Sequence, residues 1–143
     1  MTGPGRILIV DDEPSALRVL SAILEAEGYE VRQARDVESA ILLLSGEDFD
    51  SVITDMKMGD KTGLDLFEYI QGSFSDLPVI FLTAYGTVES AVGAVTRGAY
   101  YYFIKPPDYA NLKAILSKAV EQRRLKRELA ALREQLAQGG NAR

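Results

Sequence analysis

The stretch Arg6–Leu20, RILIVDDEPSALRVL, decides the fold. Four apolar residues, Ile7–Val10, end in the three acids Asp11–Glu13, and Pro14 then begins a helical pattern. A short, continuous, β-branched apolar run is typical of a strand that is buried on both faces, as in parallel sheets. Proline is favoured in the first turn of a helix. The stretch therefore predicts a buried strand, a turn that carries carboxylates, and a helix.

The same alternation of apolar runs and amphipathic stretches continues to the end of the chain. Further strands are predicted at residues 29–34, 51–54, 78–82 and 100–104. Helices are predicted at residues 14–28, 36–44, 64–71, 87–97 and 109–138, with Asp36 as an N-cap. Strands that alternate with helices indicate a parallel sheet covered by helices on both faces. The fold class is therefore α/β.

Composition restricts the chemistry that is open to the chain. The 143 residues suit one domain with an appendage, and the net charge of −5 argues against direct binding of nucleic acid. The absence of cysteine, of a signal-peptide pattern and of a membrane-spanning apolar run leads us to expect a cytoplasmic protein with no membrane contact. Because histidine is absent too, a metal site must be built from oxygen ligands, which favours Mg²⁺, Mn²⁺ or Ca²⁺.

Polar side chains follow four of the predicted strands. Asp11 and Asp12 follow the first strand, Asp55 the third, Thr83 the fourth and Lys105 the fifth. In open α/β sheets, ligands bind beyond the carboxyl ends of the strands. Three carboxylates and one ammonium group sum to −2, so a bound divalent cation would bring the site near neutrality. Such a site suits phosphoryl transfer to a carboxylate nucleophile.

The last predicted helix is longer than a compact domain needs. Residues 109–138 would span about 45 Å at about 1.5 Å per residue. The second half carries leucines at spacings of 4, 3 and 4, which is typical of a coiled-coil seam: Leu125, Leu129, Leu132 and Leu136. This leucine seam could pack back on its own domain or form a dimer. We favour the dimer, because the core-facing side of the helix is already used upstream.

Basic residues lie around the start of the seam, at Arg123, Arg124, Lys126 and Arg127. A charged run on a helix is more often a solvated face than a nucleic-acid patch. We therefore expect these four side chains to face solvent.

Four motifs together resemble one family. ILIVDDEPSA, VITDMKM with its following glycine, VIFLTAYGTVESAV and GAYYYFIKPPDYANL closely resemble the receiver domain of bacterial two-component response regulators. The resemblance covers Arg6 to Val120, with the motifs in the right order. It implies the receiver (flavodoxin-like) fold, a five-stranded parallel sheet of order 2-1-3-4-5 with helices on both faces. Here this domain carries an extended C-terminal helix.

The resemblance also implies a role for each acid of the cluster. Asp55 would be the phosphoacceptor, which receives a phosphoryl group from the phosphohistidine of a sensor histidine kinase. Asp12 and Asp55 would bind Mg²⁺ (or Mn²⁺) directly, the backbone carbonyl of Lys57 would be a third ligand, and Asp11 would act mostly through water. The chain would be a signalling domain and not an enzyme, apart from its own phosphorylation and dephosphorylation.

Further roles follow from the same resemblance. Lys105 and Thr83 would bind the phosphoryl group, and the peptide bond before Pro106 would be cis. Thr83 and Tyr102 would form the switch, which reshapes the face made by the fourth helix, the fifth strand and the fifth helix. That face, like the C-terminal helix, would contribute to a homodimer.

Within the family, the chain most resembles receivers of the NtrC class, which precede an AAA+ ATPase that activates sigma-54 RNA polymerase. Phosphorylation would then switch dimer contacts and control an output domain that this sequence does not contain. Two positions depart from the family pattern: Gly59 replaces a usual proline and Lys61 a usual hydrophobic residue. The expected division is a flexible N-terminus (1–5), a receiver domain (6–120), a coiled-coil linker (121–138) and a frayed tail (139–143).

Two other functions are open to this set of residues. One is a Mg²⁺-dependent phosphohydrolase with an aspartyl nucleophile. Enzymes of the haloacid-dehalogenase type usually carry Asp-x-Asp after the first strand and a cap insertion, whereas this chain has the adjacent Asp11 and Asp12 and no cap. The other is a silent dimerisation scaffold, which is disfavoured because every reactive position is present.

Overall fold

A parallel sheet forms the centre of the computed structural model, which describes residues 5–58, 61–84 and 86–141. The predictions for residues 1–4, for Gly59 and for the last two residues lie outside these ranges. The five strands lie in the order β2-β1-β3-β6-β7 and all pair in parallel. Their bounds are β1 Arg6–Val10, β2 Glu30–Ala34, β3 Ser51–Thr54, β6 Val79–Thr83 and β7 Tyr101–Ile104. This order is the predicted one.

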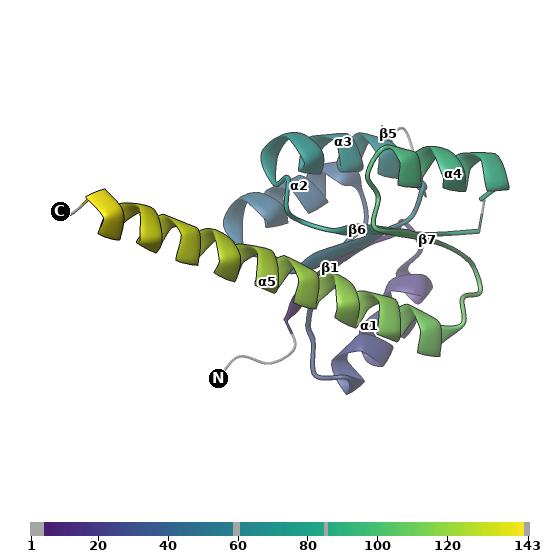
Figure 1. Ribbon diagram of the computed structural model, residues 1–143. Coiled ribbons are helices and arrows are strands. Elements are labelled where there is room, and N and C mark those ends of the chain that lie inside the picture. The colour runs from purple at the N-terminus through teal and green to yellow at the C-terminus, as the bar shows by residue number, and fades with distance from the viewer. Residues whose placement is uncertain (1–4, 59–60, 85, 142–143) are drawn as a thin grey trace.

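Helices cover both faces of the sheet (Figure 1). Their bounds are α1 Pro14–Ala26, α2 Val37–Gly46, α3 Gly63–Ser73, α4 Val88–Thr96 and α5 Tyr109–Asn141. Helices α1 and α5 lie on one face, and α2, α3 and α4 lie on the other. The predicted fold class is therefore confirmed. Within the described ranges, no helix combines the length and apolar character needed to cross a membrane.

Strand β1 explains why the sheet is buried on both sides. Leu8 and Val10 belong to the core under α2, α3 and α4, whereas Ile7 and Ile9 belong to the core under α1 and α5. All four side chains are at most 2% exposed. Alternate residues of a strand point to opposite faces, so one continuous apolar run supplies both cores.

A short hairpin between β3 and α3 was not predicted. Strands β4 (Lys57–Met58) and β5 (Lys61–Thr62) pair antiparallel, in a segment where the sequence indicated only a loop. Two-residue strands have no room to show a hydrophobic period. The hairpin returns to Gly63, where a Cβ atom would overlap the backbone carbonyl oxygen of Asp55. Glycine is therefore needed for the chain to pass so close to the end of β3.

Helix α5 continues past the sheet without a break and projects from the domain (Figure 1). It reaches Asn141, three residues beyond the predicted end. One prediction on this helix is wrong: the Arg123 side chain is only 3% exposed and contacts acids of the domain. The helix passes over the amino ends of the strands, so a residue that looks free in the sequence meets the loops there.

Candidate functional site

The structure brings three carboxylates together at the carboxyl ends of neighbouring strands. Asp11 and Asp12 follow β1, Asp55 follows β3, and one oxygen from each lies within 4.8 Å of the others. Asp11 and Asp55 are buried, whereas Asp12 is exposed. The Asp55 N–H donates to the carbonyl of Val10 at 2.9 Å, which ties the two strand ends together. The predicted acidic cluster is therefore present.

The Asp55 side chain is held from two sides. Its Oδ1 accepts hydrogen bonds from the backbone N–H groups of Met56, at 2.6 Å, and Lys57, at 3.3 Å. Its Oδ2 lies 3.6 Å from Nζ of Lys105. The arrangement fixes a buried carboxylate in one orientation.

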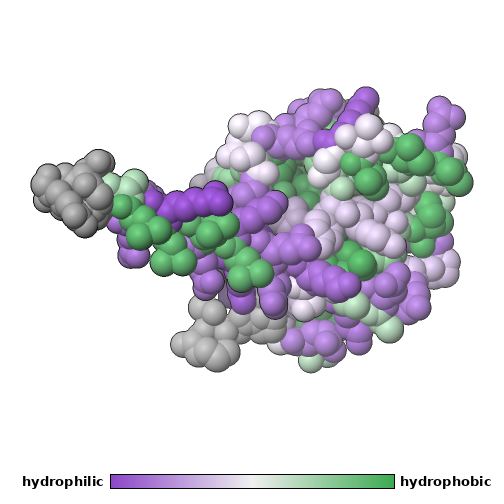
Figure 2. Space-filling view, in the orientation of Figure 1, coloured by the Kyte–Doolittle hydropathy of each residue, from purple (hydrophilic) through white to green (hydrophobic). Residues whose placement is uncertain are grey.

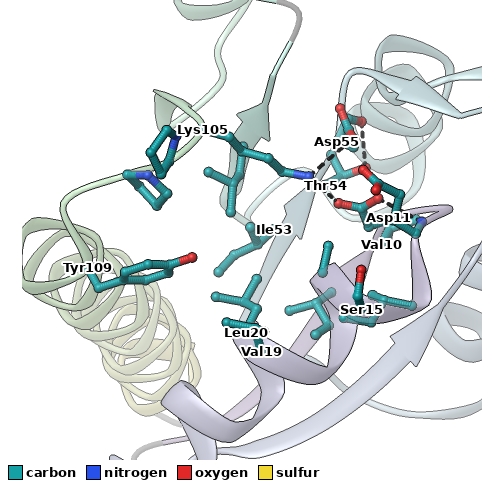
Figure 3. A pocket seen from close by; sticks show the side chains of 17 residues that line it. Val10, Asp11, Ser15, Val19, Leu20, Ile53, Thr54, Asp55, Lys105 and Tyr109 are labelled. Atoms are coloured by element: carbon teal, nitrogen blue, oxygen red, sulfur yellow. Dashed lines mark hydrogen bonds and ion pairs between the residues drawn. The ribbon is translucent and has the colours of Figure 1, made fainter.

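Lys105 joins two of the acids (Figure 3). Its Nζ donates to Oδ2 of Asp11 at 2.6 Å, and Oδ1 of Asp11 accepts from the N–H of Glu13 at 3.0 Å. Burial works to lower the pKa of Lys105, but the hydrogen bond with Asp11 and the charges of Asp11 and Asp55 outweigh it and raise that pKa above its ordinary value. Lys105 therefore stays charged and offsets part of the negative charge of the cluster.

The backbone delivers Thr83 and Lys105 to the same edge of the sheet. Thr83 is the last residue of β6, next to β3, and is fully buried. The Lys105 N–H donates to the Thr83 carbonyl at 2.9 Å, and the Lys105–Pro106 peptide bond is cis. The predicted hydroxyl and ammonium residues therefore end adjacent strands beside the acids.

Tyr102 is turned toward α4. It is half-buried, its ring lies 6.0 Å from that of Phe81, and its hydroxyl is 2.9 Å from Oγ of Ser90 in the first turn of α4. A Cβ atom at Gly86 would lie only 2.7 Å from the Tyr102 hydroxyl, so the loop before α4 passes close to this ring. Tyr102 thus connects β7 with α4. No pattern in the sequence indicated the contact of Tyr102 with Ser90.

The three carboxylates suit a divalent cation. Hard cations such as Mg²⁺ prefer oxygen ligands and use few protein carboxylates. Because Asp12 is exposed while Asp11 and Asp55 are buried, the cluster is open to solvent on the Asp12 side. An open side suits a cation that keeps several of its waters. The role of the Lys57 carbonyl as a ligand stays a prediction.

A cleft of about 400 Å³ opens beside the cluster. Asp11, Asp55 and Lys105 line one part of it, while Leu20 of α1 and Tyr109 of α5 line another (Figure 3). Most of the lining is apolar, so a partner that reaches Asp55 from this side meets a hydrophobic wall. This wall was not predicted, because it joins residues from α1, β3 and the start of α5 that only the fold brings together.

Comparison with known proteins places this site in a family. The model of the response regulator receiver domain matches residues 7–126. The response regulator protein PilR of Pseudomonas aeruginosa is 39% identical over 118 residues, which cover 82% of this chain and 26% of PilR. The chain thus spans about a quarter of the length of this relative.

Solved structures agree with the sequence relatives. NtrX from Brucella abortus in complex with ADP has a TM-score of 0.85 at 34% identity, over 96% of this chain and 30% of NtrX. A response regulator receiver domain protein from Clostridium thermocellum has a TM-score of 0.79 at 31% identity, over 84% of this chain and 97% of that one. The chain therefore belongs to the response regulator receiver domain family and is most similar to the receivers of NtrC-class regulators.

Proposed function

We propose that this chain is a phosphorylatable receiver in which a sensor histidine kinase phosphorylates Asp55 in a Mg²⁺-dependent reaction. The observation that carries the proposal is the joint placement of the three carboxylates and Lys105 at one edge of the sheet. Each residue alone has an ordinary structural explanation. Four such residues delivered by three different strands to one point fit a site that handles a phosphoryl group.

The acids would hold the cation that the reaction needs. Asp11, Asp12, Asp55 and the carbonyl of Lys57 are the proposed ligands of Mg²⁺ or Mn²⁺. When bound, the cation would offset the charge on the oxygens of the transferred group. Lys105 is already placed to assist, because its ammonium group lies within 3.6 Å of the acceptor carboxylate.

The transfer itself is a displacement at phosphorus. A carboxylate oxygen of Asp55 forms the new P–O bond while the P–N bond to the kinase imidazole breaks, and the leaving nitrogen keeps the electron pair and takes a proton. Lys105 and the hydroxyl of Thr83 donate hydrogen bonds to the phosphoryl oxygens. The backbone N–H groups of Met56 and Lys57 keep the acceptor oriented.

The response travels through Thr83 and Tyr102 to the face made by α4, β7 and α5. This face exposes several large apolar side chains: Val88, Val92, Val95, Tyr101 and Ile104. We propose that phosphorylation changes homodimer contacts there and along α5, and so controls an AAA+ output domain. The proposed division is a receiver at 6–120 and a coiled-coil linker at 121–138, in a cytoplasmic protein whose receiver does not itself bind DNA.

The second candidate, a phosphohydrolase with an aspartyl nucleophile, predicts a different outcome. A hydrolase needs groups that bind a small substrate and a water-activating base, whereas the cleft beside Asp55 is mostly lined by apolar residues. In the described part of the chain, no inserted element covers that cleft. We therefore favour the receiver.

Stoichiometry separates the two functions. Protein incubated with Mg²⁺ and p-nitrophenyl phosphate should release less than about one equivalent of nitrophenol per hour. Acetyl phosphate, in contrast, should transfer at most one phosphoryl group to each chain. Sustained turnover of p-nitrophenyl phosphate that is lost in Asp55→Asn would establish the hydrolase instead. Glu68→Gln, an exposed acid on α3, is the matched control.

A further inference from the structure

The β4–β5 hairpin leaves the sheet beside Asp55 and returns to the same point. At its base the Gly63 N–H donates to the Met56 carbonyl at 2.8 Å, and Gly63 packs directly against the carbonyl of Asp55. Lys57, whose carbonyl is a proposed ligand of the cation, belongs to β4. The position of this hairpin therefore sets where one of the proposed ligands lies relative to Asp55.

The hairpin is too short to hold this position by its own hydrogen bonds. Each of its strands is two residues long, and even a longer isolated hairpin is marginally stable at best in water. Contacts with the rest of the domain must therefore fix it. One such contact is the Met58 side chain, which is 4% exposed and belongs to the core under α2, α3 and α4.

An ion pair provides a second contact, between β5 and α2. Lys61 is the cross-strand partner of Met58, and directly opposite residues of a ladder point to the same side of it. The Lys61 side chain therefore lies on the side of the hairpin that faces the core. There its Nζ lies 2.8 Å from Oε2 of Glu38, in the first turn of α2. We call Lys61 and Glu38 the hairpin latch.

The latch stands at the rim of a hollow beside Asp12, the exposed acid of the cluster. The hollow has a volume of about 330 Å³, and Asp12, Met58 and both latch residues line it. The hydrogen bond with Glu38 raises the pKa of Lys61, and the same bond lowers the pKa of Glu38, so both stay charged near neutral pH. The latch thus closes the hairpin onto α2 on the side where the cluster is open to solvent.

We propose that the hairpin latch positions the β4 ligand of the cation, so that Lys61 strengthens the binding of Mg²⁺ although it carries a positive charge. The inference rests on the metal site of the proposed function and adds two positioning residues to it. The latch side chains are 54% exposed at Lys61 and 62% exposed at Glu38, so the pair contributes little to the stability of the whole domain. Its effect lies in the position of the hairpin and therefore in the affinity for the metal.

Lys61→Met separates this effect from simple electrostatics. If Lys61 acted only through its charge, its removal would leave the surroundings of the cluster more negative and would tighten the binding of Mg²⁺. If Lys61 acts through the latch, its removal frees the hairpin, and the dissociation constant for Mg²⁺ should rise about two- to threefold. Glu38→Gln should raise that constant at least as much, because it loses the latch and a negative charge together. The two explanations therefore predict opposite signs for Lys61→Met.

Lys113→Met is the matched control. Lys113 forms a partly exposed pair with Glu27 at 3.5 Å, between α5 and the end of α1 on the other face of the sheet. Its replacement removes the same charge and an ion pair of the same kind, but no contact of the hairpin. The affinity of Lys113→Met for Mg²⁺ should therefore not be weaker than that of the wild type.

The latch variants leave the proposed dimer surfaces untouched. Figure 2 shows exposed hydrophobic residues over α4 and along the projecting part of α5, whereas Glu38 belongs to α2 and Lys61 to β5. A change of Mg²⁺ affinity in these variants is therefore not a consequence of altered dimer contacts.

Charge exchange provides a second test of the pair itself. Lys61→Glu alone sets two glutamates against each other and should weaken the binding of Mg²⁺, although it adds negative charge near the cluster. Combined with Glu38→Lys, it restores an attracting pair, and the affinity should return to that of the wild type. A double variant that stays as weak as Lys61→Glu, or a Lys61→Glu variant that binds Mg²⁺ more tightly, would overturn the proposal.

Titration of metal-free, ¹⁵N-labelled protein with Mg²⁺ measures the affinity by NMR. The amide signals of Met56 and Lys57 report directly on the site, because both N–H groups donate to Asp55. Weaker binding by Lys61→Met, with no weakening in Lys113→Met, would support the latch. Unchanged or tighter binding by Lys61→Met would overturn the latch and leave the metal site standing. A wild type whose signals do not respond to Mg²⁺ would overturn the metal site and the latch together.

Discussion

Replacing Asp55 with asparagine should make the metal-free protein more stable, although it removes the residue proposed to do the chemistry. The substitution keeps the shape of the side chain and an Oδ1 that can accept from the N–H groups of Met56 and Lys57. It removes one negative charge from the cluster. Whether the substitution raises or lowers the stability of the protein therefore depends on the balance of charges around Asp55.

The charges nearest to Asp55 almost cancel. Lys105 at 3.6 Å attracts Asp55 by about 5 kcal/mol at an effective dielectric constant of about 20. Asp11, within 4.8 Å, repels it by about 3 kcal/mol or more in the same medium. Exposed Asp12 adds about 1 kcal/mol of repulsion, because water screens it.

Desolvation then decides whether Asp55→Asn stabilises or destabilises the protein. The Asp55 carboxylate is only 4% exposed, and burial of a charge costs several kcal/mol that two backbone hydrogen bonds offset only in part. Lys105 keeps its shorter contact with Asp11, at 2.6 Å, in the variant. Asp55→Asn should therefore raise the free energy of unfolding by about 1–2 kcal/mol without metal.

Thermal unfolding in EDTA and in millimolar Mg²⁺ measures this effect. In EDTA the melting temperature of Asp55→Asn should exceed that of the wild type by about 3–6 °C. Added Mg²⁺ should stabilise the wild type more than the variant, because the cation relieves repulsion that the variant has already lost. Glu68→Gln controls for the change in net charge. A variant that is less stable than the wild type in EDTA, or equal gains from Mg²⁺ in both proteins, would refute the reasoning.

Three further predictions concern other parts of the structure. Gly63→Ala should lower the free energy of unfolding by about 2 kcal/mol or more, since the new Cβ meets the Asp55 carbonyl oxygen and the backbone must move; urea unfolding measures it, and a neutral effect would contradict the close approach. Arg123→Met should lower the free energy of unfolding by about 1–2 kcal/mol, less than for a fully buried pair because its acids are partly exposed; unchanged stability would mean that the ion pairs of Arg123 contribute nothing. Burial works to raise the pKa of Asp76, but the hydrogen bond from Arg127 and the charges of Arg123 and Arg127 outweigh it and lower that pKa. The resulting stabilisation, under about 1 kcal/mol for a side chain this exposed, is present above the ordinary carboxyl pKa of 3.8 and is lost as the pH falls through the lowered value. Asp76→Asn should therefore destabilise the protein more at pH 6 than at pH 3, where part of the stabilisation is already lost, and a deficit that is constant with pH would exclude this linkage.

The part of the site that depends on strand ends was predictable from the sequence. Once Ile7–Val10 is identified as a buried strand, parallel pairing places Asp11 and Asp12 at the edge where Asp55 and Lys105 also arrive. The strand order followed from the family resemblance and is confirmed by the pairing of the strands. The heptad spacing likewise indicated a helix that extends past the domain, and α5 does so.

Features that depend on the meeting of distant side chains were not predictable. Arg123 looks like any basic residue of a charged helix, and only the path of α5 brings it to Asp48, Asp50 and Asp76. The contact of Tyr102 with Ser90 depends on how α4 packs beside β7. Such contacts leave no periodic signal in the sequence, because each needs two loops or elements to be placed correctly first.

The measurement that tests the central claim most directly is the intact mass of the protein after incubation with acetyl phosphate, with and without Mg²⁺. The wild type should gain one phosphoryl group only when Mg²⁺ is present, and Asp55→Asn should gain none. Asp76→Asn, which changes a carboxylate at the opposite edge of the sheet, should be phosphorylated to the same extent as the wild type. An adduct that persists in folded Asp55→Asn, or that forms equally well in EDTA, would contradict the assignment of Asp55 as the Mg²⁺-dependent phosphoacceptor.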